Sequence, residues 1–255
     1  MKIEKEFIGY SVIGLVTISC IAIVLMLDPI AQDLKYHLFR DKRTLLGIPN
    51  FWNVISNIPF FIVGIMGLHN ILRSHRIKFI GELKSAYILL FLGVSIVGFG
   101  SAYYHLRPSN SSLVWDRLPM TIAFMSLFAV IIAEFVSVRL GKYLLWPLVV
   151  FGAFSIIYWD STERSGDGDL RMYVVVQFLP IILIPIILLI FKSKFNTIGG
   201  YWLLLCAYAL AKVFEYFDET IYSFLHIISG HSLKHVIAAI GVLLLLRAYK
   251  IRALA

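Results

Sequence analysis

Charged residues are scarce in this chain, since only 15% of its 255 residues are Asp, Glu, Lys or Arg. A water-soluble domain carries about a quarter charged residues. Hydrophobic residues make up 60% of the chain, and the mean hydropathy is +0.85. Too little polar surface is available to cover a globule in water. The composition therefore excludes a soluble protein and predicts an all-α, polytopic transmembrane helix bundle.

Cysteine and acidic residues are also few. The two cysteines, Cys20 and Cys206, both lie in apolar segments, which excludes a disulfide framework. Lys and Arg outnumber Asp and Glu by 23 to 15, but no basic tract is present. The cations stand in short connections between apolar runs, so they indicate membrane topology and contact with anionic lipid headgroups rather than nucleic acid.

Apolar runs of membrane-spanning length recur along the chain. The run at 7–27 has no small-residue cleavage pattern after it, so we interpret it as a retained helix and not a signal peptide. Each run is close to the ~20 residues that a bilayer requires. We expect one integral membrane domain with eight helices, at residues 7–27, 50–72, 84–105, 117–138, 141–159, 171–191, 198–217 and 231–248.

The distribution of Lys and Arg predicts the orientation of this bundle. More of them fall at the two termini and in the connections near 73–84, 139–142 and 192–194 than in the alternate connections. This bias predicts that both termini are cytoplasmic. His105, Asp116 and His231 then lie at the opposite, non-cytoplasmic ends of their helices, at one depth.

Four of the polar residues at that depth come in pairs with helical spacing. Ser101 and His105 are four residues apart, as are His231 and His235, so each pair shares one helix face. Two histidines at this spacing can hold one metal ion, and His105 would supply a third ligand. Three nitrogen ligands leave one position open, which suits a catalytic Zn²⁺. Asp116 is a candidate proton shuttle beside it.

Other uses of these histidines are open from the sequence. Spacing of four arises by chance, and histidines at helix ends often face lipid headgroups. A haem bound between His105 and one of the later histidines is a further alternative. The remaining histidines fit interfacial or loop positions, with His226 as the best spare ligand: His37, His69, His75 and His226.

Three quoted segments carry a resemblance to a known family. They are "NFWNVISNIPF" (50–60), "GSAYYHLRPSNSSLVWDRLPM" (100–120) and "GHSLKH" (230–235). Their combination resembles the alkaline ceramidases, within a wider group of seven-helix zinc hydrolases that includes adiponectin-receptor-like proteins. The resemblance runs from about residue 50 to the C-terminus. It implies a seven-helix core at 50–248, to which the helix at 7–27 is an addition.

The resemblance also implies an activity and a set of roles. The protein would be a zinc-dependent amidohydrolase that cleaves ceramide-like N-acyl lipids to a fatty acid and a long-chain base. His105, His231 and His235 would hold Zn²⁺. Ser101 would hydrogen-bond the reacting oxygen, and Asp116 would carry a proton to the leaving amine. The alternative is a receptor-like or lipid-binding protein with a structural zinc, which would not need Ser101 and Asp116.

Calcium regulation, a feature of eukaryotic alkaline ceramidases, is doubtful here. Asn50 stands where the family's helix-start glutamate is expected, and only Asp28, Asp33 and Asp41 precede it.

Three other polar groups are expected to be structural. Asn53, Ser56 and Asn57 form one helix stripe, which favours hydrogen bonds between helices. Lys212 and Glu215 are expected to form an ion pair within the membrane that fixes packing, with a role at a substrate head group as the alternative. The segment 160–171, "DSTERSGDGDLR", is expected to be a solvated loop near the metal end.

Overall fold

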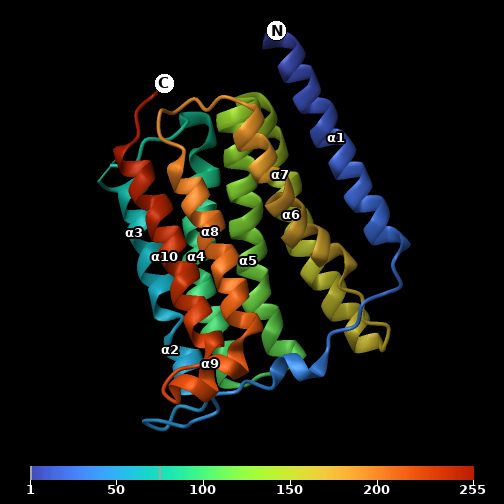
Figure 1. The fold of residues 1–255 in the computed structure, drawn as a ribbon, viewed down its shortest axis with the longest axis vertical. Helices are drawn as coiled ribbons and strands as arrows, with labels where there is room; N and C mark the ends of the chain where they lie inside the picture. The colour runs from blue at the N-terminus through green and yellow to red at the C-terminus, as the bar shows by residue number, and fades with distance from the viewer. Residues whose placement is uncertain (1, 75) are drawn as a thin grey trace.

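The structure is a computed structural model that describes residues 2–74 and 76–255, so His75 lies outside the described residues. Across these residues the chain is helical and forms no β-sheet. The long helices run roughly antiparallel to one another in a single bundle (Figure 1). This arrangement satisfies the backbone hydrogen bonds within each helix, as lipid requires.

The observed helices follow the predicted ranges closely. The bounds are α1 Lys2–Met26, α2 Phe51–Ile55, α3 Ile58–Leu72, α4 Lys84–Leu106, α5 Asn110–Ile131, α6 Val138–Ser165, α7 Arg171–Ile190, α8 Gly199–Tyr216, α9 Asp218–Leu225 and α10 Gly230–Ile251. Short 3₁₀ turns lie at Leu34–His37 and Gly81–Leu83, and a π-helical turn, Ile132–Val136, extends α5.

Within the described residues, seven helical segments are long and apolar enough to cross a membrane. One predicted crossing, the helix α8, is not among these seven. It is less apolar because it carries Lys212 and Glu215 near its end. It nevertheless runs the length of the bundle beside α10 (Figure 1). The all-α membrane bundle expected from the sequence is confirmed. The protein is an integral membrane protein.

The start of α5 corrects the sequence prediction. The sequence predicts that this helix begins at residue 117, but α5 begins at Asn110. The Ser109 side chain accepts from the backbone N–H of Ser112, and the Ser112 hydroxyl receives the Ser109 N–H in return. This reciprocal cap starts the helix two turns early. Asp116 therefore stands inside α5, on rigid backbone.

The predicted loop at 160–171 is half helical, which is a second correction. Residues 160–165 complete α6, and Gly166 ends it in the left-handed conformation, at φ +90°. This is a common helix stop, since glycine adopts this conformation without strain. In the remaining turn, hydrogen bonds from Arg171 hold the pKa of Asp169 below its usual value.

The two ends of the bundle differ in character. Both termini lie at one end, while α9 and the connection from α1 to α2 lie at the other (Figure 1). At the terminal end, Glu134 in the π-helical turn is fully buried and pairs with Arg252 at 2.8 Å. Tyr87 and Tyr201 donate to the same carboxylate. This cluster fixes the segment after α10 to the end of α5.

Candidate metal centre

Three buried histidines meet at the end of the bundle opposite the termini. His105 lies in the last turn of α4, and His231 and His235 lie in the first two turns of α10. One nitrogen from each ring lies within 4.8 Å of the others. The structure thus brings together the three residues that the sequence predicts as ligands, although they are up to 130 positions apart in the chain.

The distances fit a shared metal ion. The Nε2 atoms of His105 and His231 are 3.4 Å apart. Two nitrogen ligands at 2.0–2.1 Å from a tetrahedral zinc stand about 3.3–3.4 Å apart. The three ring centroids lie 4.9–5.1 Å from one another, so the rings surround a point. This arrangement favours a single ion over a haem, whose flat macrocycle must separate its axial ligands.

Ser56 sets the tautomer of His235. The Ser56 hydroxyl donates to the Asn53 carbonyl at 3.1 Å and lies 2.9 Å from Nδ1 of His235. A hydroxyl has one proton, so with that proton committed to Asn53 it must accept from His235 Nδ1–H. The lone pair of His235 is then on Nε2, which is the state that a metal ligand needs.

The polar stripe of Asn53, Ser56 and Asn57, on α2 and the turn after it, ties this segment to α10, as the sequence predicts. Asn53 is completely buried, and its side-chain oxygen receives the Ser232 hydroxyl at 2.6 Å. Its amide nitrogen donates to the Asp41 carbonyl at 3.1 Å. Asn57 donates to the Asn53 carbonyl at 2.7 Å. The stripe therefore holds the first turn of α10, and with it His231 and His235, against α2.

The connection from α1 to α2 covers the histidines. The Phe39 ring lies 4.6 Å from the His105 ring and 5.0 Å from the His231 ring, centroid to centroid. Phe39 is only 4% exposed, so it separates the histidines from water on this side. The Asn50 side chain donates to the His105 carbonyl at 2.8 Å, which satisfies a carbonyl at the end of α4.

The first turn of α10 is fixed at three points. Ser229 caps the helix by accepting from Ser232 N–H. The backbone N–H of His231 donates to Asp218 Oδ1 at 2.7 Å. A Cβ at Gly230 would lie 2.2 Å from the Phe214 carbonyl oxygen, so only glycine allows this approach to α8. His226, the spare ligand suggested by the sequence, is not part of the histidine cluster.

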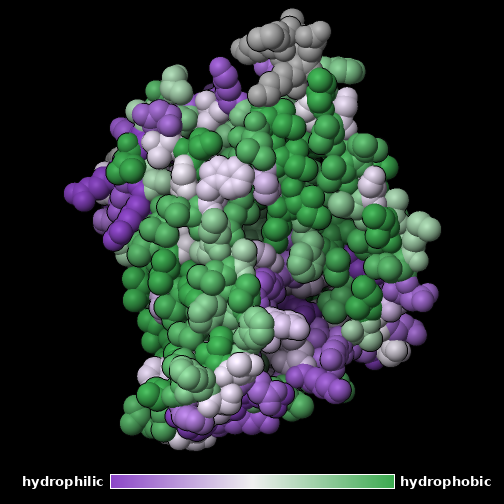
Figure 2. Space-filling view, in the orientation of Figure 1, coloured by the Kyte–Doolittle hydropathy of each residue, from purple (hydrophilic) through white to green (hydrophobic). Residues whose placement is uncertain are grey.

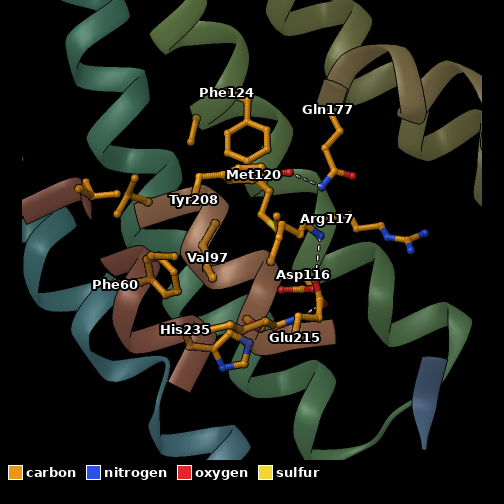
Figure 3. Close-up of a pocket in the computed structure, with 18 of the residues that line it drawn as sticks. Phe60, Val97, Asp116, Arg117, Met120, Phe124, Gln177, Tyr208, Glu215 and His235 are labelled. Carbon is orange, nitrogen blue, oxygen red and sulfur yellow. Dashed lines mark hydrogen bonds and ion pairs between the residues drawn. The ribbon is translucent and has the colours of Figure 1, made fainter. Parts of the chain in front are cut away.

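A cavity of about 260 Å³ opens beside the histidines. Asp116 and His235 line one end, and Met120 and Phe124 stand further along the wall (Figure 3). Ser101 also lines this cavity, as Asp116 does. The cavity thus has polar side chains beside the histidines and apolar side chains over most of its wall. Such a chamber suits a molecule with one polar group and a hydrocarbon chain.

Comparison with known protein families agrees with this geometry. The family model described as Ceramidase matches residues 46–253, which cover α2 to α10. The chain belongs to the ceramidase family. No similar sequence was found among curated proteins. The resemblance inferred from the three sequence segments is confirmed, and family membership supports a ceramidase-type amide hydrolase.

The match to the ceramidase family begins after α1. Within the described residues α1 packs mainly against α7, where Gly9 sits against Ile190 and Phe191. Most of its apolar side chains are exposed, as lipid-facing residues are. We propose that α1 is an addition to a seven-helix core.

The donor set of this ceramidase-family site narrows the choice of metal. Three imidazole nitrogens suit zinc, copper, iron or nickel, whereas calcium and magnesium prefer oxygen ligands. Among the acids before α2, Asp41 is engaged elsewhere, because both of its carboxylate oxygens accept hydrogen bonds from Arg43.

Several residues of the site were missed by the sequence reasoning. Phe39 could not be recognised from the sequence, because a single aromatic residue in a connection between helices belongs to no motif or periodic pattern. Ser56 was recognised only as part of a polar stripe, although its partner is His235. Lys234 stands between His231 and His235 in the sequence and pairs with Glu215. The Lys212–Glu215 pair was predicted, and its Nζ to Oε2 distance is 2.8 Å.

Proposed function

We propose that this protein is a zinc-dependent amidohydrolase of the membrane, which cleaves the N-acyl amide bond of ceramide-like lipids. One observation carries the proposal: in a ceramidase-family chain, three buried histidines adjoin a cavity that is polar at their end and apolar beyond. The reaction adds water across the amide and releases a fatty acid and a long-chain base.

In this proposal His105, His231 and His235 hold the zinc ion. When bound, zinc supplies Lewis-acid chemistry: it polarises a carbonyl and makes water a nucleophile near neutral pH. The chain's own residues do the rest. Asp116 takes the proton that the attacking water loses and gives it to the nitrogen of the leaving amine. Ser101 donates its single hydroxyl proton to the carbonyl oxygen as the negative charge on that oxygen grows.

The apolar wall positions the acyl chain. Val94, Val97, Met120, Phe124 and Val242 line the cavity away from the histidines. A hydrocarbon chain laid against them removes apolar surface from water and fixes the amide at the polar end. The same placement favours a hydrolase over the receptor-like alternative, because Ser101 and Asp116 stand where an amide would meet the histidines.

The test is metal analysis joined to a hydrolysis assay on one preparation. We expect about one zinc per chain in purified protein and release of fatty acid from ceramide or a related N-acyl lipid. His231→Ala and His235→Ala should each lose most of the zinc and the activity. The control is His69→Ala, in the last turn of α3 and outside the histidine cluster, which should retain both the zinc and the activity. Full zinc in the His231→Ala/His235→Ala double variant would refute the site.

A further inference from the structure

A charged cluster that the proposed mechanism does not use lines the same cavity. It consists of Lys212 and Glu215 on α8 and Lys234 on α10. Figure 3 places Glu215 close to Asp116 and His235. Charged side chains at membrane depth are costly, and they usually mark a pathway or a binding site. The cluster is therefore a candidate binding site for a charged group.

Glu215 holds both lysines. Its Oε2 pairs with Lys212 at 2.8 Å, and its Oε1 pairs with Lys234. One carboxylate thus sets two ammonium groups side by side. Each ammonium has three N–H donors, of which Glu215 takes one. Further donors on both lysines are left for a ligand in the cavity.

The balance of charge around the cavity is positive. Its wall carries three cations, Arg117, Lys212 and Lys234, against two carboxylates, Asp116 and Glu215. The Arg117 guanidinium stacks on aromatic rings and not on a carboxylate: it lies 4.6 Å from the Trp159 ring centre and 4.9 Å from that of Tyr173. Arg117 therefore adds to the positive charge of the wall, while Lys212 and Lys234 are the cations that meet at Glu215. In a cavity with lipid around it, an excess positive charge favours an anionic ligand strongly.

The cluster also lies where the head of a substrate would stand. Lys234 directly precedes His235, and Lys212 has a side chain that is 45% exposed. Figure 2 shows hydrophilic side chains inside a hollow of the otherwise apolar surface, over the part of Figure 1 between α7 and α8. With the acyl chain on the apolar wall and the amide at His235, the group beyond the amide nitrogen reaches the lysines.

We propose that Lys212 and Lys234, set by Glu215, form a subsite for an anionic oxygen group on the substrate. The preferred substrate is then an N-acyl lipid with a carboxylate or phosphate close to the amide, rather than an uncharged ceramide. This inference rests on the proposed function for its reaction, but it concerns a separate property, the charge of the head group.

The experiment compares lipids that differ only in charge. N-acyl serine is paired with its methyl ester, and N-acyl ethanolamine phosphate is paired with N-acyl ethanolamine. We expect kcat/KM for one acidic member to exceed that of its neutral partner by about tenfold or more, the scale of hydrogen bonds to a charged group. The pair that shows the preference identifies carboxylate or phosphate as the ligand.

Variants locate the effect. Lys212→Gln and Lys234→Gln should each bring the acidic-to-neutral ratio towards one, while Lys142→Gln, an exposed lysine on α6, should leave it unchanged. If Lys234→Gln does not fold, the exposed Lys212 carries the test. Equal rates within both pairs, or a ratio that both lysine variants leave intact, would overturn the subsite.

A binding measurement separates this inference from the proposed function. Non-hydrolysable sulfonamide analogues of the acids and their neutral partners are titrated against the zinc-loaded protein. Tighter binding of an acidic analogue, reduced by Lys212→Gln, supports the subsite even if no amide is cleaved. Cleavage of ceramide with no preference among the analogues supports the hydrolase and refutes the subsite.

Discussion

At the scale of single residues, the hydrogen bond between Ser56 and His235 decides the state of a proposed ligand. We predict that Ser56→Ala weakens zinc binding by about 10- to 100-fold, as the loss of such supporting bonds typically does. Ser56→Thr keeps the hydroxyl and is the matched variant. Zinc affinity is measured by competition with a chelator. Equal affinity in Ser56→Ala and the wild type would show that the bond does not orient His235.

A substitution at Asp116 can distinguish a role in catalysis from a role in metal binding. We predict that Asp116→Asn retains near-normal zinc and loses hydrolysis by roughly 10²-fold or more, the scale of a lost general acid–base group. Asn has almost the same shape, so the packing of α5 should survive while the carboxylate no longer accepts and returns a proton. Zinc content, thermal stability and fatty-acid release are measured on one preparation. Wild-type hydrolysis would remove Asp116 from the mechanism, and loss of zinc would make it a ligand or ligand support.

At the scale of elements, Arg43 joins the connection before α2 to the turn before α10. Its guanidinium donates to the Asp41 carboxylate at 2.7 and 2.9 Å and to the His226 carbonyl at 3.1 Å. It also donates to the Ile227 carbonyl. Hydrogen bonding to Asp41 raises the pKa of Arg43. The contact keeps Phe39 and the first turn of α10 together over the histidines.

We predict that Arg43→Met lowers thermal stability and speeds zinc loss on dialysis, because it leaves the buried Asp41 carboxylate, 1% exposed, without its partner. Arg43→Lys should rescue little, since a single ammonium cannot bridge a carboxylate and two carbonyls. The double variant Asp41→Asn/Arg43→Met should be milder than Arg43→Met alone, since neither charge is then stranded. A double variant as damaged as the single would contradict this account.

The positions of the helices could be predicted from the sequence, whereas several contacts between them could not. Helix positions follow from apolar runs, because lipid imposes both length and composition on each span. The spacing of four placed Ser101 with His105 and His231 with His235. The start of α5 was missed because Ser109 and Ser112 look like loop residues until their mutual cap is seen. Phe39, Ser56 and Lys234 depend on contacts between distant segments, which no local pattern encodes.

At the scale of the whole molecule, the terminal end is fixed by the buried Glu134–Arg252 pair. We predict that Glu134→Gln destabilises the protein by about 3–5 kcal/mol, because it strands the buried Arg252 charge. Zinc content should be unchanged, since the histidines lie at the other end of the bundle. Thermal unfolding in detergent measures the loss, with the exposed Glu82→Gln as the control. An unchanged unfolding temperature would show that the cluster does not stabilise the bundle.

The orientation of the whole bundle is the last prediction. Both termini lie at one end (Figure 1), as an even number of crossings requires, and α8 must cross for this parity to hold. That end holds the larger share of Lys and Arg, so we predict that both termini are cytoplasmic. A reporter fused after Ala255 should read as cytoplasmic, and one inserted at Gly166, in the turn after α6, should read as external. External location of the C-terminal reporter would overturn the prediction. If the prediction holds, the histidines and the cavity beside them lie in the outer half of the bilayer, and substrate is drawn from the outer leaflet.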